Sequence, residues 1–140
     1  MGAPLSIRFD PSVLERLRRR ARTTPGATPS GLVQRLVDEG LRMDDHPGIV
    51  FKDGPAGRRA ALALGPDVWE IVTVARGIDK RGTKAVAAIG EAMNLAAWQV
   101  NVALDYYGSY PEEIDEEIAA REAAARTAEA AWTTRQQLLA

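Results

Sequence analysis

The chain has 140 residues, of which 46% are hydrophobic and 26% are charged, and it contains no cysteine. This length allows one or two small domains and excludes a large multidomain enzyme. Without cysteine there is no disulfide framework and no thiolate metal site, which fits a reducing compartment. No apolar run approaches the length of a membrane span and the N-terminus lacks an apolar signal core, so we expect a soluble, cytoplasmic protein with no membrane partner.

Charge is divided unevenly along a chain whose formal net charge is −1. Residues 1–43 hold eight arginines against four acids, which gives +4. Residues 44–110 hold seven basic against eight acidic residues, which gives −1, and residues 111–140 hold three arginines against seven acids, which gives −4. A basic N-terminus suits contact with nucleic acid, and an acidic C-terminus suits a different partner.

The first predicted element is a short strand over residues 4–10. Leu5, Ile7 and Phe9 alternate there with polar residues, the period of two that is typical of a strand buried on one face. No second strand is predicted nearby. We therefore expect this strand to pair antiparallel with its copy in a second chain across a two-fold axis.

Two amphipathic helices follow, over about residues 11–22 and 29–41. Apolar residues on one face of the first helix leave a run of arginines largely outside. Thr28 is a good N-cap for the second helix, because Pro29 follows at the first helical position. The amides of such a helix start attract anions, although capping alone explains these residues equally well. The predicted core face of the first helix consists of Val13, Leu14, Leu17 and Ala21, and the predicted dimer core consists of Leu32, Val33, Leu36, Val37 and Leu41 of the second helix.

One strand and two helices in this order resemble the ribbon-helix-helix (CopG/Arc-like) family of dimeric DNA-binding proteins. The resemblance covers roughly the first 42 residues and rests on the strand length and on the two helix starts, Asp10-Pro11-Ser12 and Thr28-Pro29-Ser30. It implies a DNA-binding and dimerisation segment over residues 1–43 that contacts operator DNA. The DNA contacts expected from it are Ser6 and Arg8 at base edges, and Arg16, Arg19, Arg20, Thr28 and Ser30 at phosphates.

The composition changes after residue 43, where residues 44–48 have the character of a linker. The segments IVFKD and GRRAALAL then flank the turn residues 54–57 and predict a β-hairpin. A helix is predicted from about Pro66, capped near Gly65, and is expected to end at Gly77.

A helix-turn-helix is predicted around Asn94. The small Gly90 and the turn-forming Asn94 have the spacing of that motif, in which a small residue allows close crossing and the turn requires a left-handed residue. The second helix, from about residue 96 to 107, offers Gln99 and Asn101 but no lysine or arginine. Phosphate neutralisation supplies most non-specific DNA affinity, so we favour a packing or dimerisation unit and leave DNA reading as the alternative.

Three stretches resemble a small bacterial domain that occurs in antitoxins of VapB type: HPGIVFKDGPAGRRAAL, the VWEIV helix and AWQVNVALDYYGSYPEEID. This second resemblance covers roughly residues 46–118, and its YPEEID ending is the most distinctive part. It implies a hairpin plus helix-turn-helix antitoxin domain over residues 46–110. It also implies a partner, a toxin of the PIN-like ribonuclease type.

The last predicted helix covers residues 111–140 and is expected to bind the toxin. Ser109 and Glu112 form an S-x-x-E capping box at its start. Its apolar stripe is too thin to fold this segment unaided, so a partner is expected; docking on its own domain or dimer is the alternative. The stripe consists of Ile118, Ala125, Trp132 and Leu139.

PIN-like ribonucleases concentrate carboxylates to hold metal ions. The simplest inhibitor therefore brings an arginine to those carboxylates and anchors it with an aromatic residue. We expect Arg135 and Trp132 to form this pair, with Arg121 next. The predicted toxin-binding residues are Arg121, Trp132, Arg135 and Leu139.

No catalytic pattern stands out in the sequence. The single histidine, His46, has Asp44, Asp45 and Asp53 near it, but not at the spacing of a known metal site. No nucleophile motif is present. We predict a non-enzymatic protein without metal or cofactor.

The predicted fold is mainly α with short β: a ribbon-helix-helix dimer, then a small domain of a β-hairpin and a helix-turn-helix, and a long C-terminal helix. The leading hypothesis is an antitoxin of a type II toxin-antitoxin system, which neutralises a PIN-like ribonuclease and represses its own operon as a homodimer or higher oligomer. One alternative is a stand-alone ribbon-helix-helix regulator whose second domain senses a ligand or only oligomerises. Another is a protein-interaction inhibitor that does not bind DNA.

Overall fold

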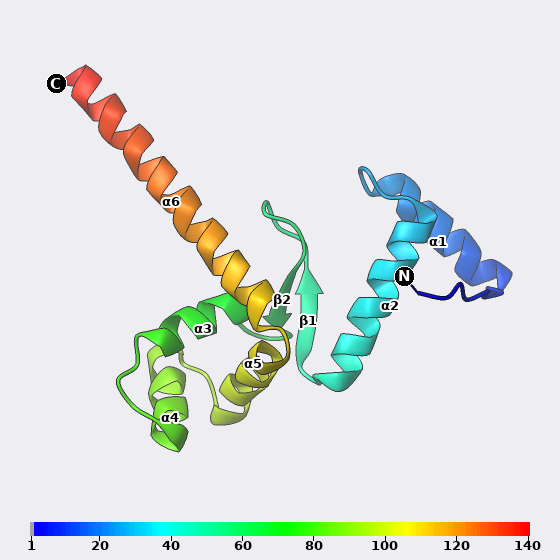
Figure 1. Cartoon of the computed structure of the whole chain (residues 1–140), viewed down its shortest axis with the longest axis horizontal. Coiled ribbons are helices and arrows are strands. Elements are labelled where there is room, and N and C mark those ends of the chain that lie inside the picture. Colours follow the sequence, from blue (N-terminus) through cyan, green and yellow to red (C-terminus); the bar gives the residue numbers. More distant parts are fainter. Residues whose placement is uncertain (1) are drawn as a thin grey trace. The chain divides into compact units, whose positions relative to one another are not determined.

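The computed structural model describes residues 2–140, which are mainly helical with one small antiparallel sheet (Figure 1). The chain divides into two compact units, Met1–Arg42 and Met43–Ala140, called here the first and second units. In chain order, the elements are α1 (Pro11–Thr23), α2 (Pro29–Asp45), β1 (Ile49–Lys52), β2 (Arg59–Leu62), α3 (Val68–Arg76), α4 (Gly82–Met93), α5 (Ala97–Ser109) and α6 (Pro111–Leu139).

The strand predicted over residues 4–10 is not formed in the single chain, where no strand is assigned to these residues. The physical reason is that a β-ladder requires a partner strand, and one chain offers none here. The two helices are present. α1 begins with Pro11 at its first position, and the Leu14 amide donates to the Asp10 carbonyl at 3.0 Å. α2 is longer than predicted and runs to Asp45.

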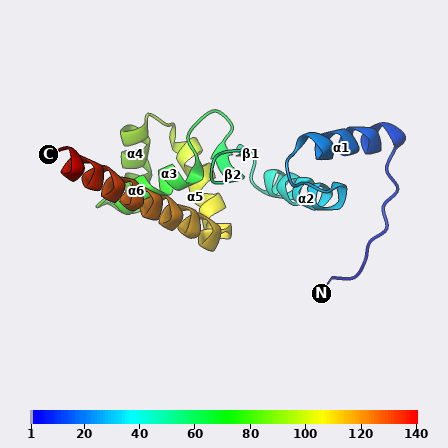
Figure 2. The same ribbon diagram turned by 90° about the horizontal axis from the view of Figure 1, so that it is seen from above.

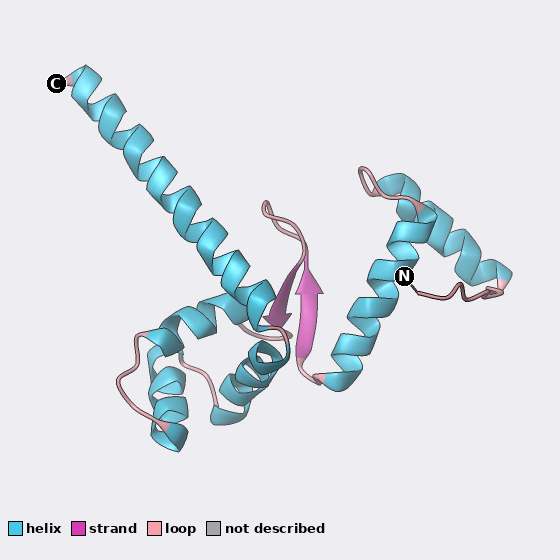
Figure 3. Ribbon diagram, in the orientation of Figure 1, coloured by secondary structure: helices cyan, strands magenta, loops and turns pink. Residues whose placement is uncertain are grey.

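The hairpin predicted after the linker is confirmed (Figure 3). β1 and β2 pair antiparallel, with Ile49 opposite Leu62 and Lys52 opposite Arg59. The turn closes where the Gly57 amide donates to the Gly54 carbonyl at 2.9 Å, and Gly57 has φ +104°, which glycine adopts without strain.

α3 is capped by Asp67 rather than near Gly65. The Asp67 amide donates to Glu70 Oε2 at 2.8 Å, which is half of a capping box. Between α4 and α5 the chain turns through Asn94, whose φ of 54° and ψ of 51° are left-handed, as its sequence predicts. A Cβ on Gly90 would lie 2.6 Å from the Leu95 carbonyl oxygen, so this turn requires glycine there.

The capping box predicted from Ser109 and Glu112 is wrong. The Tyr110 amide donates to the carbonyls of Tyr106 and Tyr107 at 3.0 and 3.2 Å, so α5 continues through Ser109. α6 instead begins with Pro111 at its first position and Tyr110 as N-cap. Pro111 suits that position, because the first amides of a helix have no partner within it.

The core of the second unit lies where α3 and α5 pack on the hairpin and the start of α6 packs on α3 and α5. Tyr106 is fully buried at its centre and donates its hydroxyl to Glu113 Oε2 at 2.7 Å. The side chains of Ile71, Ile89 and Ile114 are fully buried with it. This unit therefore closes a core within one chain.

Candidate nucleic-acid and partner interfaces

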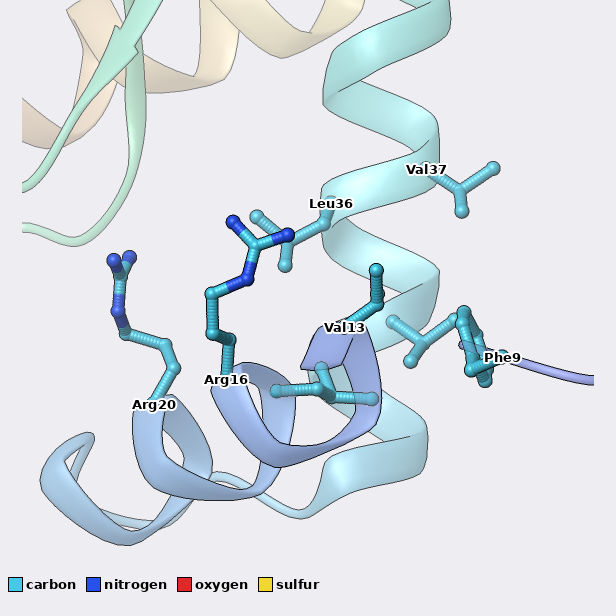
Figure 4. Close-up of a pocket in the computed structure, with 8 residues that line it drawn as sticks. Phe9, Val13, Arg16, Arg20, Leu36 and Val37 are labelled. Atoms are coloured by element: carbon cyan, nitrogen blue, oxygen red, sulfur yellow. The ribbon is translucent and has the colours of Figure 1, made fainter. Parts of the chain in front are cut away.

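The first unit carries an open apolar groove between α1 and α2 (Figure 4). Its volume is about 430 Å³. Leu36, Val37 and Leu41, all predicted core residues, are 42%, 51% and 60% exposed in the single chain. One chain therefore does not bury the residues that its own pattern marks for burial. The groove is lined by Phe9, Val13, Arg16, Leu17, Arg20, Val33, Leu36 and Val37.

The extended N-terminal segment lies beside the start of α2. Leu5 and Ile7 line a second hollow, of about 330 Å³, together with Pro29 and Ser30. Leu5 is 82% and Ile7 55% exposed, whereas a strand buried on one face would cover both. This arrangement brings the segment that carries Ser6 and Arg8, both exposed, next to the helix start that carries Thr28 and Ser30.

The start of α2 borders a small pocket of about 270 Å³ in the loop before it. Thr28 caps the helix, since its Oγ1 accepts from the Gly31 amide at 3.1 Å. The Gly31 amide is therefore satisfied within the helix start. Arg35 also lines the pocket; its Nε is buried without a hydrogen bond and lies 3.7 Å from Glu39 Oε2, with which it forms an ion pair. Sequence reasoning missed Arg35, although it lies two helical turns after Thr28 on the same face.

The arginines of α1 have different surroundings. Arg19 forms an exposed ion pair with Glu15 at 3.1 Å, one turn earlier. Arg16 and Arg20 are exposed, as predicted, and they also line the apolar groove (Figure 4). Helical spacing explains this, because residues 13, 16, 17 and 20 share one face of α1.

In the second unit, the C-terminal half of α6 is exposed. Figure 1 shows this half extending away from the rest of the unit, Figure 2 shows the same helix from above, and every residue from 122 to 140 is exposed. Trp132 and Leu139 are 61% and 66% exposed. They follow the buried Ile118 at intervals of 14 and 21 residues, so they continue the face that packs on the core. Arg135 is exposed beside them.

Arg121 is not available in the same way as Arg135. Its guanidinium carbon lies 4.3 Å from the centre of the Trp69 ring, a cation–π contact, and its Nη2 lies 3.4 Å from Glu117 Oε1. Arg121 therefore packs on its own unit, in the N-terminal half of α6. The N-terminal part of α6, up to Arg121, is therefore docked on its own unit, whereas residues 122–140 are exposed.

A charged network joins the hairpin, α3 and α6 around this contact. Arg59 forms an ion pair with Asp67 and donates to the Asp53 carbonyl at 2.6 Å. Trp69 Nε1 donates to Asp67 Oδ2 at 3.1 Å, beneath Arg121. Burial raises the pKa of Glu117, although Arg121 opposes the rise. Sequence reasoning missed this network; the D-x-x-E spacing of Asp67 and Glu70 was its one visible sign.

The helix after Asn94 offers little for DNA reading. Gln99, one of its two amide side chains, accepts from the Ala96 amide at 2.9 Å and so caps α5. Asn101 is exposed, and Trp98 is 65% exposed. The face lacks cations, as the sequence shows.

His46 lies in an aromatic cluster, with ring centres 5.3 Å from Tyr106 and 5.9 Å from Tyr110. Among residues 2–140, no group of three or more His, Asp or Glu side chains is arranged to hold a metal ion. In the same part of the chain, no helix is both long and apolar enough to cross a membrane.

The chain matches no protein-family model, no curated protein and no solved structure at a significant level.

Proposed function

We propose that this chain is a dimeric DNA-binding repressor that also acts as an antitoxin, with operator DNA and a PIN-like ribonuclease as its two partners. The observation that carries the proposal is the unclosed first unit, in which an apolar groove and the exposed Leu5 and Ile7 lie beside a capped helix start. Such an arrangement is what one half of a ribbon dimer requires. A second copy would pair the two extended segments and cover both hollows.

Pairing of the segments would also define the DNA-binding face. Because side chains alternate across a strand, burial of Leu5 and Ile7 turns Ser6 and Arg8 to the opposite face. A two-stranded ribbon of this kind fits the major groove of DNA. The start of α2 supports the same role, since its N-terminal dipole can hold a phosphate beside the ribbon.

The ribonuclease is assigned to the exposed half of α6. Trp132 and Leu139 continue the apolar face of the core into solvent, and Arg135 lies beside them. A large aromatic residue next to an arginine is a combination enriched in protein interfaces. The carboxylates of a PIN-like active site would accept the guanidinium of Arg135.

The experiment compares the full chain with a version that ends after Arg121, which removes only exposed residues. Both should dimerise and bind the DNA upstream of their gene, but only the full chain should restore growth when a ribonuclease encoded beside it is expressed. Arg135→Ala should weaken this rescue, and the matched Arg126→Ala should not. Rescue by the shortened chain would move the inhibitory surface to residues 46–118. DNA binding with no inhibited ribonuclease would favour a stand-alone regulator.

A further inference from the structure

Arg16 and Arg20 stand along one wall of a groove that is otherwise apolar. Figure 4 shows both guanidinium groups extending from α1, with Arg16 reaching towards Leu36 of α2. Any occupant that covers the groove removes part of their water, and an arginine that loses water requires an anionic partner.

Three of the four acids of the first unit are already paired, and the fourth, Asp10, is the exposed N-cap residue of α1, six residues before Arg16. Glu15 pairs with Arg19 at 3.1 Å, Asp38 with Arg42 at 3.1 Å and Glu39 with Arg35 at 3.7 Å. Within residues 2–140, no ion pair involves the two groove arginines, which are Arg16 and Arg20. The anion that satisfies them must therefore come with the occupant.

The last turns of α2 carry a stripe with the matching chemistry. Val37, Leu41 and Asp44 follow one another at intervals of four and three residues, so they share one face of a helix that continues to Asp45. Val37 and Leu41 are about half exposed or more, and Asp44 is exposed. The stripe thus presents apolar side chains and ends in a carboxylate.

Helix spacing allows the carboxylate of this stripe to reach the groove arginines of a second copy. If Leu41 of a second copy enters the groove, its Asp44 lies about 4.5 Å further along the helix axis, at 1.5 Å per residue. Arg16 and Arg20 are one turn apart on α1, about 6 Å, so one or both guanidinium groups come within reach of that carboxylate. A two-fold axis repeats the contact on the other side of the dimer.

We propose that the occupant of the groove is a second copy of this chain, and that Arg16 and Arg20 recognise Asp44 of that copy. This inference rests on the dimer in the proposed function and goes beyond it. In this inference, Arg16 and Arg20 contact the partner chain instead of DNA phosphates, and they determine which chains can pair. A related chain with a cation or an apolar residue at the position of Asp44 would leave both arginines unpaired and would be rejected.

The test is a charge exchange in the full chain. The double variant Arg16→Glu/Arg20→Glu and the single variant Asp44→Arg should each dimerise at least about 10-fold more weakly, a loss of about 1.4 kcal/mol. Mixed together, they should form a heterodimer in preference to either homodimer. Exchange between two fluorescently labelled chains measures both effects. The matched control is Arg18→Glu/Arg22→Glu, which changes the same charge on the opposite face of α1 and should dimerise as the unaltered chain does.

Two results would overturn the inference, and they differ in what else they affect. If the unaltered chain dimerises but the exchanged charges neither weaken it nor favour the heterodimer, the groove arginines do not choose the partner and the dimer itself stands. Loss of DNA affinity in that case would return Arg16 and Arg20 to phosphate contacts. If the unaltered chain is a monomer by sedimentation equilibrium, both the inference and the proposed dimer fail. Circular dichroism shows whether each variant retains its helices.

Discussion

The two units bury their apolar side chains to different degrees. Among residues 2–140, the buried apolar residues of the first unit are Ala21 and Leu32, and all others belong to the second unit. Both units are built from amphipathic elements with similar residue types. The second has enough elements to enclose its apolar faces, whereas two helices and one extended segment cannot enclose a core.

This difference predicts two kinds of stability. The core of the second unit forms within one chain, so its free energy of unfolding should not depend on protein concentration. The first unit requires a second copy to cover Leu36, Val37 and Leu41, so its stability should rise with concentration. Thermal unfolding followed over a range of concentrations separates the two transitions.

The largest effect is expected where the groove of the first unit is given a charge. Val37→Asp places a carboxylate in the covered groove of the dimer, and an uncompensated buried charge costs about 3–5 kcal/mol. The dimer contains two copies of it, so dimerisation should be lost together with DNA binding, while the second unit unfolds as before. Sedimentation equilibrium measures the loss. The control is Ser12→Asp, which adds the same charge at an exposed position of α1 that lines neither hollow and should dimerise normally. A Val37→Asp dimer of ordinary strength would show that the groove is not an interface.

A cavity in the second unit should have the next largest effect. Ile71 is fully buried, and its truncation in Ile71→Ala should cost about 2–5 kcal/mol. Urea unfolding should show this loss at every protein concentration, and dimerisation should not change. The matched control is Val74→Ala on the same helix, where a half-buried side chain should cost less. A loss that varies with concentration would mean that the second unit is also completed by another chain.

Much of the local structure could be predicted from the sequence. Helix starts, the hairpin and the left-handed Asn94 follow from residues that act on their immediate neighbours. The failure at Ser109 has a local cause too. Its capping pattern competed with a continuing α5, and the amide bond of Tyr110 to the preceding turn decided the outcome.

The candidate sites were harder to predict from the sequence than the local structure was. Periodicity marks residues for burial but does not say which chain buries them, so the prediction that Val37 and Leu41 lie in a dimer core depended on the resemblance to a dimeric family. The contact of Arg121 with Trp69 joins residues that lie 52 positions apart, and no periodicity within α6 separates Arg121 from Arg135. Helical spacing alone places Arg16 and Arg20 beside the apolar face of α1, at the edge of the groove, but the sequence analysis treated the arginine run as one exposed face.

Loss of the α2 cap should have an intermediate effect and should fall on the first unit alone. Thr28→Ala removes the acceptor of the Gly31 amide, and the loss of such a cap typically costs about 1 kcal/mol. Because folding and association of the first unit are coupled in our proposal, the cost should appear as weaker dimerisation. Thr28→Ser retains the acceptor and should behave as the unaltered chain does. If both variants bind DNA more weakly at unchanged dimer strength, the Thr28 methyl group or its position at a phosphate matters more than the cap.

The smallest effect concerns Glu117, a partly buried carboxylate in the second unit. Burial raises the pKa of Glu117 above its ordinary value of about 4.3, although its ion pair with Arg121 opposes the rise. Between the unfolded and the folded pKa, the folded chain holds a proton that the unfolded chain has released. The free energy of unfolding therefore falls as pH rises through this window. Glu117→Gln cannot titrate, so it should gain stability relative to the unaltered chain as pH rises from about 4 to 7.

Urea unfolding at a series of pH values measures this difference, at one fixed protein concentration. Glu116→Gln is the matched control, because it makes the same change of charge one position away at an exposed site and should follow the unaltered chain more closely. The effect should be the same at every concentration, since Glu117 and Arg121 contact each other within one chain. If Glu117→Gln instead loses stability as pH rises, the ion pair with Arg121 outweighs the cost of burial. The ion pair between Glu117 and Arg121, rather than the packing of Arg121 on Trp69, would then hold the N-terminal part of α6 on the second unit.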